Sequence, residues 1–169
     1  MKICGVVGWK NSGKTFLAQK LISYFNEKEL IVSSIKHAHH DFDIDKPNTD
    51  SYLHRQAGSQ QIIISSSKRW AKITELKKSK EKTLYELIAE LNTSDIVIVE
   101  GFKNEKHLKI EIISDTADSS TYLFPYLENI IGIVSDTTIN TPIKQFKKIR
   151  NNFGGGNFFS EGNFLVGGR

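Results

Sequence analysis

Hydrophobic and polar positions follow two different periods along the chain. Short apolar runs such as "KICGVVG" (2–8) predict buried strands, because a parallel strand covered on both faces is apolar at nearly every position. Apolar side chains at helical spacing follow and predict a helix from Lys14 to about Asn26. Strands that alternate with helices predict right-handed crossovers and an α/β fold of three layers, with a mainly parallel central sheet flanked by helices.

The remaining segments are assigned on the same pattern. We expect strands over 30–36, 60–65, 95–103, 108–114 and 129–136, an edge strand within 70–76, helices over 51–58 and 81–92, and a basic helix after Pro142. Residues 37–50 hold three histidines and four aspartates and read as an irregular loop. Residues 153–169 have six glycines and four phenylalanines without periodicity. We therefore expect a nucleotide-binding domain over 1–152 and a tail that is disordered or ordered by a partner.

Composition narrows the class of protein. A chain of 169 residues with 38% hydrophobic and 25% charged residues is ordinary for one soluble domain. The net charge of +4 suits an anionic ligand but falls short of a nucleic-acid-binding composition. Cys4, the single cysteine, fits a reducing compartment and a small buried hydrophobe. No apolar stretch approaches the ~20 residues that are needed to cross a bilayer. Because the N-terminus is expected to enter a strand at once, we expect no room for a signal peptide. We expect a cytoplasmic protein without membrane contact.

The loop "GWKNSGKT" has the spacing of a phosphate-binding loop. Gly8 and Gly13 let successive backbone N–H groups point at one anion, at the start of a helix whose dipole adds about +0.5 charge. Lys14 supplies a mobile charge for the outer phosphates, and the Thr15 hydroxyl is placed to ligate Mg²⁺. The other loop residues expected to contact the nucleotide are Asn11, Ser12 and Phe16. The alternative is a glycine turn that merely caps a helix.

A phosphate site also needs a carboxylate for the metal. In "DIVIVEGF", Glu100 stands at the carboxyl end of an apolar strand, where open α/β sheets bind ligands. Because Asp is commoner at such a position, Glu100 either binds Mg²⁺ directly or acts through a bound water. A strand-terminal glutamate in solvent is the alternative.

The segment "IKHAHHDFDIDKPNTDS" is the most unusual stretch of the chain. One interpretation is a loop that reaches the γ-phosphate and its Mg²⁺, as the loop after the second strand does in P-loop GTPases. A zinc site and a solvated polar loop are the alternatives. The candidate catalytic carboxylates are Asp41 and Asp43, the candidate metal ligand is Asp45, and the candidate nucleotide contact is His37. Which aspartate approaches the metal stays open, as does any role of His39 and His40.

Five pieces taken together resemble the MobB family, the molybdopterin-guanine dinucleotide biosynthesis adaptor proteins: "GWKNSGKT", "IKHAHHDFDIDKPNTDSY", "RQAG", "RWA" and "IVEGFK", in that order. The resemblance covers Met1 to about Asp136 and leaves out the tail. It implies a P-loop GTP-binding fold, a homodimer and at most slow GTP hydrolysis. It also implies a partner, the guanylyltransferase that joins GMP to molybdopterin, with molybdopterin as a further candidate ligand. By position, Glu100 and the segment 37–45 would flank the metal.

No motif marks the residue that would recognise guanine, because the sequence "NKxD" is absent from the chain. Asp136, at the end of "IIGIVSD", can accept from the N1 and N2 hydrogens of guanine, although a turn-forming aspartate explains the position equally well. Lys10 would reach a neighbouring subunit's phosphates only in a dimer, and relatives of this fold carry such a lysine one position earlier, where this chain has Trp9.

Two further functions compete with a GTP-binding adaptor. An ATP-dependent small-molecule kinase or ligase would use the segment 37–58 to hold an acceptor, with Arg55 and the histidines binding its anionic groups. Nucleic-acid binding through the basic runs is less favoured, because such runs are usually solvated faces. Arg55 and Arg69 are the arginines near the motifs, and neither stands in the context of an arginine finger, which predicts slow hydrolysis.

Overall fold

The computed structural model describes residues 1–38 and 41–148, which cluster into two compact units. Among the described residues, the larger unit contains Met1–His37 and 84–148, and the smaller contains Ala38 and 41–83. The smaller one interrupts the larger one in sequence, within the range 1–152 for which a single domain was predicted. The predicted tail over 153–169 lies outside the described residues.

The larger unit contains a six-stranded sheet in the order β2-β5-β1-β6-β7-β8, with every neighbouring pair parallel. Its strands are β1 (Lys2–Val7), β2 (Val32–Lys36), β5 (Ile96–Glu100), β6 (Lys109–Ile112), β7 (Ile130–Val134) and β8 (Gln145–Phe146). The register pairs Lys36 of β2 and Val6 of β1 with Glu100 of β5. Because parallel strands end at the same edge, the carboxyl ends of these three strands lie together.

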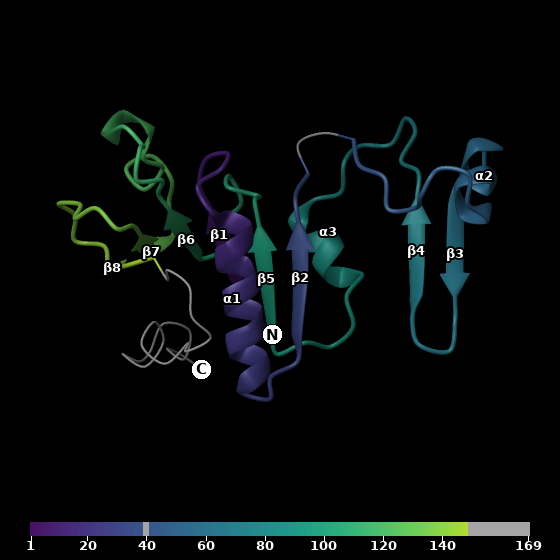
Figure 1. Ribbon diagram of the computed structural model, residues 1–169, viewed down its shortest axis with the longest axis horizontal. Helices are drawn as coiled ribbons and strands as arrows, with labels where there is room; N and C mark the ends of the chain where they lie inside the picture. Colours follow the sequence, from purple (N-terminus) through teal and green to yellow (C-terminus); the bar gives the residue numbers. More distant parts are fainter. Residues whose placement is uncertain (39–40, 149–169) are drawn as a thin grey trace. The chain divides into compact units, whose positions relative to one another are not determined.

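Two helices cover the two faces of this sheet. Helix α1 (Lys14–Glu27), which Figure 1 shows in front of the sheet, buries Leu21 and neighbouring side chains against Cys4 and Ile98. Helix α3 (Leu84–Ala89) packs Leu84 against Val97 and Val99, which point to the opposite face because side chains alternate along a strand. Each large apolar side chain buried in this way contributes about 1.5–3 kcal/mol. The predicted three-layer α/β fold is confirmed.

The smaller unit contains a helix and an antiparallel hairpin. Helix α2 (Asp50–Gln56) precedes strand β3 (Gln61–Ser65), whose one partner among the described strands is β4 (Trp70–Thr74). The two strands are joined by a turn closed by the hydrogen bond from Ser66 N to Arg69 O, 2.9 Å. A turn this short cannot carry the crossover that a parallel pair needs. The predicted strand over 60–65 and the predicted edge strand within 70–76 are confirmed, and they pair with each other as a two-stranded antiparallel sheet.

The prediction of a basic helix after Pro142 is wrong over 143–148, the part of that segment that the structure describes. The chain there forms β8, which adds to the edge of β7 through hydrogen bonds from Ile133 N to Lys144 O, 3.0 Å, and from Ser135 N to Phe146 O, 2.9 Å. An open strand edge offers these backbone partners, and a helix would leave them unused. A short 3₁₀ helix, η1 (Ser119–Thr121), lies between β6 and β7. None of the described helices is long and apolar enough to span a bilayer.

Candidate functional site

The loop between β1 and α1 has a backbone that requires glycine. Gly8 and Gly13 have φ angles of 149° and 101°, and Asn11 has a φ of 62°. A Cβ on Gly8 would lie 2.4 Å from the backbone oxygen of Ile112 and 2.7 Å from Ser12 Oγ. The loop therefore curls against the end of β6 and leads directly into α1, as its glycine spacing predicts.

The start of α1 offers N–H donors that no side chain of the helix satisfies. Gly13 is the N-cap residue, no side-chain cap hydrogen bond is present, and no acidic residue stands in the first turn. The first N–H groups and the helix dipole therefore favour an external anion. Ser12 Oγ is buried in the same loop and has no hydrogen-bond partner among the described residues.

Lys14 closes over the loop in this structure. Its Nζ donates a hydrogen bond to the backbone oxygen of Trp9, 2.6 Å away. Partial burial lowers the pKa of Lys14, Glu100 opposes that shift, and Lys36 adds to it. An ammonium group held by a single carbonyl can exchange this partner for a phosphate oxygen, which makes a stronger, charge-assisted bond.

Thr15 and Glu100 meet as the sequence analysis expects. Thr15 Oγ1 donates to Glu100 Oε1 at 3.0 Å, and Lys36 Nζ lies 3.6 Å from the same oxygen. A hydroxyl and a carboxylate are hard oxygen ligands of the kind that Mg²⁺ prefers, so these two residues fit that ion. Sequence reasoning missed Lys36, although its place at the end of β2, next to β5, was a usable signal.

His37 lies beside the same strand end. Its backbone N–H donates a hydrogen bond to the backbone oxygen of Glu100 at 2.9 Å. Its ring stacks on the ring of Phe102, with the ring centroids 4.4 Å apart. Gly101 allows this approach, because it has a φ of 98° and a Cβ there would lie 2.7 Å from the Cβ of His37. The predicted nucleotide contact of His37 stays a prediction.

The three candidate aspartates belong to the smaller unit, where Arg55 holds two of them. Arg55 pairs with Asp43 at 2.7 Å and with Asp45 at 2.8 Å, and it lies 3.5 Å from Glu75. The hydrogen bond with Asp45 is the largest cause that raises the pKa of Arg55 above its ordinary value. Asp41 is exposed. Arg55 is thus engaged by carboxylates of its own unit, which argues against the alternative in which it binds an acceptor's anionic groups.

The roles expected for Asp41, Asp43 and Asp45 toward the metal stay predictions. His39 and His40 lie outside the described residues. Within the described part of the chain, no three histidine, cysteine, aspartate or glutamate side chains form a group that could hold a metal ion.

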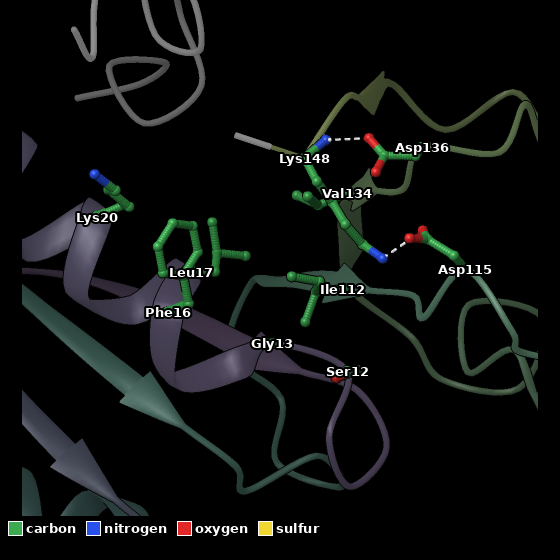
Figure 2. A pocket seen from close by; sticks show the side chains of 10 residues that line it. All are labelled: Ser12, Gly13, Phe16, Leu17, Lys20, Ile112, Asp115, Val134, Asp136 and Lys148. Carbon is green, nitrogen blue, oxygen red and sulfur yellow. Dashed lines mark hydrogen bonds and ion pairs between the residues drawn. The ribbon is translucent and has the colours of Figure 1, made fainter. Parts of the chain in front are cut away.

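A pocket of about 310 Å³ begins at the loop and continues beside α1 (Figure 2). Phe16 and Leu17 of α1 form one wall, and Ile112 and Val134, at the ends of β6 and β7, form the floor. Asp136 lies at the far side, where its Oδ1 accepts a hydrogen bond from the backbone N–H of Lys148 at 3.1 Å. The predicted nucleotide contacts Ser12, Gly13, Phe16 and Asp136 therefore line one cavity.

Lys148 is a second residue that sequence reasoning missed. Its Nζ lies 2.7 Å from Asp115 Oδ1, so one residue connects both carboxylates at this side of the pocket. No local pattern in the sequence marks Lys148, because its place depends on the addition of β8 to the sheet. Sequence reasoning also missed that Trp9 connects the loop before α1 to η1: its indole N–H donates a hydrogen bond to the backbone oxygen of Thr121.

A parallel sheet, a glycine loop that leads into α1, and a lysine, a threonine and a glutamate gathered at that loop define an α/β protein of the P-loop type. The sequence profile of the family described as "Molybdopterin guanine dinucleotide synthesis protein B" (MobB) matches residues 3–136. The chain belongs to the MobB family, and the resemblance seen in the sequence is confirmed.

Named relatives agree with this assignment. The chain is 38% identical over 137 residues to the molybdopterin-guanine dinucleotide biosynthesis adapter protein of Escherichia coli strain K12, covering 80% of this chain and 78% of that one. It is 39% identical over 108 residues to the protein of that name from Haemophilus influenzae, covering 64% and 61%. This chain is therefore an adapter-family protein of molybdopterin guanine dinucleotide biosynthesis, and this role implies a partner enzyme.

Solved structures agree on the fold. The chain resembles the crystal structure of Bacillus subtilis MobB with a TM-score of 0.68 and 22% identity, over 87% of this chain and 90% of that one. A MobB homologue from Bacillus stearothermophilus gives a TM-score of 0.67 at 20% identity, over 87% and 88%. At these identities the likeness concerns the fold alone.

Proposed function

We propose that this protein binds GTP with Mg²⁺ and acts as an adaptor for the guanylyltransferase that joins GMP to molybdopterin. The observation that carries the proposal is the loop at the start of α1. Its positive-φ glycines, the buried Ser12 hydroxyl without a partner, and a helix N-terminus without a side-chain cap together suit a polyphosphate.

The proposed metal ligands are Thr15 and Glu100, which lie within hydrogen-bond distance of each other. When bound, Mg²⁺ would neutralise charge on the outer phosphates. Lys36 partly neutralises Glu100 in the absence of the ion, and Lys14 would move from the Trp9 carbonyl to a phosphate oxygen. Asp45 is a further candidate ligand, with Asp41 and Asp43 as candidates to order a water molecule.

Slow GTP turnover is part of the proposal. Arg55 is engaged by three carboxylates, which disfavours it as an arginine finger. An adaptor that retains its nucleotide can present it, or the conformation it stabilises, to a partner enzyme. We further propose a homodimer, which the family resemblance implies, and a cytoplasmic location, which the composition favours, with molybdopterin as a second candidate ligand.

Lys14→Ala tests the phosphate site. Loss of one charge-assisted contact should weaken GTP binding by about 1.5–3 kcal/mol, whereas the melting temperature without ligand should barely change. The matched control is Lys28→Ala, which removes a lysine at the opposite end of α1. Calorimetric titration with GTP and Mg²⁺ measures both variants. Equal GTP affinity in the Lys14 variant and the unmodified protein would contradict the proposal.

Single-turnover hydrolysis separates an adaptor from an enzyme. We expect a rate well below roughly 1 s⁻¹ for the protein alone, since kinase-like catalysis begins near that value. A faster rate without any partner would contradict the adaptor role. Tighter binding of ATP than of GTP, with phosphate release triggered by a metabolite, would instead favour the kinase or ligase alternative.

A further inference from the structure

Lys36 brings a second ammonium group to the carboxylate of the proposed metal site. Its Nζ lies 3.6 Å from Glu100 Oε1, the same oxygen that accepts the hydrogen bond of the Thr15 hydroxyl at 3.0 Å. The side chain of Glu100 is 13% exposed, whereas that of Lys36 is 64% exposed. Glu100 therefore belongs to the wall of the site, and Lys36 reaches the same oxygen from the solvent side.

The register of the sheet places Lys36 on the face where α1 begins. Strands β2 and β5 are parallel, and Lys36 stands beside Glu100. Ile98 packs in the core cluster that contains side chains of α1, whereas Val99 and Ile35 pack in the cluster that contains α3. Since side chains alternate along a strand, Glu100 and Lys36 both point to the α1 face. The sheet itself thus holds the two side chains next to each other.

This end of the sheet carries an excess of positive charge. Partial burial is the first cause that lowers the pKa of Lys14, the charge of Glu100 opposes that shift, and the charge of Lys36 adds to it. Two ammonium groups therefore share the field of one carboxylate, at a helix N-terminus that is itself electropositive. Such an arrangement favours an anion that carries more than one charge.

Magnesium at Thr15 and Glu100, as proposed above, would increase this excess. Glu100 would then face the ion, and Lys36 would lie next to a like charge without its carboxylate partner. In the sheet, β5 lies between β1, which leads into the phosphate loop, and β2, which carries Lys36. A polyphosphate that extends from the loop toward the metal would therefore bring its terminal group between Lys14 and Lys36.

From this geometry we propose that Lys36 binds the terminal phosphate of the nucleotide and makes the site selective for a triphosphate over a diphosphate. The inference rests on the proposed function for the phosphate loop and the metal, and it adds the residue that recognises the third phosphate. The loop N–H groups and Lys14 serve a diphosphate as well. Lys36, on the far side of Glu100, reaches the terminal phosphate alone.

Titration calorimetry of the full chain with Mg²⁺ and either GDP or the β,γ-imido analogue of GTP, which is not hydrolysed, tests this role. Lys36→Met keeps an aliphatic side chain and removes the charge. Affinity for the triphosphate should fall about 10-fold, the lower end of the range for a hydrogen bond to a charged group because Lys36 is largely exposed, and affinity for GDP should not change. The matched control is Lys2→Met, which removes an exposed lysine at the opposite end of β1 and should change neither affinity.

A conservative variant separates phosphate binding from a merely structural role. Lys36→Arg keeps the positive charge and should retain most of the preference for the triphosphate. A lysine that only positions Glu100 would act through the metal, so its loss would weaken both nucleotides to the same degree. An equal loss for both nucleotides in Lys36→Met would therefore overturn the role proposed for Lys36.

The remaining outcomes distinguish this inference from the proposed function. If the unmodified protein binds both nucleotides and Lys36→Met leaves both affinities unchanged, the role of Lys36 is wrong and the phosphate site stands. If the unmodified protein binds neither nucleotide, the proposed function fails and the role of Lys36 fails with it.

Discussion

Replacement of Gly8 by alanine should damage both stability and phosphate binding. An alanine there must hold a φ of 149° and place its Cβ 2.4 Å from the oxygen of Ile112. Backbone strain of this kind costs about 1–3 kcal/mol, and overlap in a packed site costs about 1–3 kcal/mol more. The expected loss is therefore about 2–6 kcal/mol, a large part of the roughly 5–15 kcal/mol that stabilises an ordinary domain.

Gly13→Ala is the matched control for that experiment. Gly13 also has a positive φ, 101°, but the nearest atom to its added Cβ is Ile112 Cδ1 at 3.2 Å, the end of a flexible side chain. It should suffer the backbone cost without the overlap. Urea unfolding without ligand should therefore place Gly8→Ala about 1–3 kcal/mol below Gly13→Ala. Equal stability of the two variants would refute the close approach of the loop to β6.

Two other predictions concern charged and titratable groups. Glu100→Ala should make GTP affinity nearly independent of Mg²⁺, and a Mg²⁺ titration identical to that of the unmodified protein would remove Glu100 from the metal site. His107 is buried, and burial first, then the charge of Lys109, lowers its pKa from 6.5 to about 4. The unfolded chain therefore binds a proton that the folded chain does not as pH falls from about 6.5 to 4, which costs up to about 3 kcal/mol of stability. Urea unfolding across this pH range should show a smaller loss of unfolding free energy for His107→Leu than for the unmodified protein. Parallel curves of unfolding free energy against pH would contradict the lowered pKa of His107.

Several features of the site were predictable from the sequence because their cause is local. Gly8 and Gly13 occur at the spacing that the curled loop needs, and the apolar stripe that follows predicts α1 within about one residue of its observed ends. Glu100 could be placed as well, because it directly follows the apolar run of "DIVIVEGF" and parallel strands end at one edge. The meeting of Thr15 and Glu100 then follows from the fold class.

Other features depend on pairings between distant segments. Nothing near Asp45 in the sequence shows that Arg55 holds it, and nothing near Asp136 shows that Lys148 donates to it. Glu111 is a further example. Its carboxylate is buried and accepts hydrogen bonds from the backbone N–H groups of Leu123 and Phe124, whereas the sequence pattern shows only a polar residue within a strand.

By itself the sequence determined most of the helices and strands, the α/β class and the phosphate loop, because the period of apolar residues and the steric freedom of glycine act between near neighbours in the chain. Only the tertiary structure decided the strand order, the separate β3–β4 hairpin, the addition of β8, and the pocket that joins Phe16 to Asp136. Those features depend on which buried surfaces and strand edges meet across long stretches of chain, and a spacing rule carries no information about such meetings.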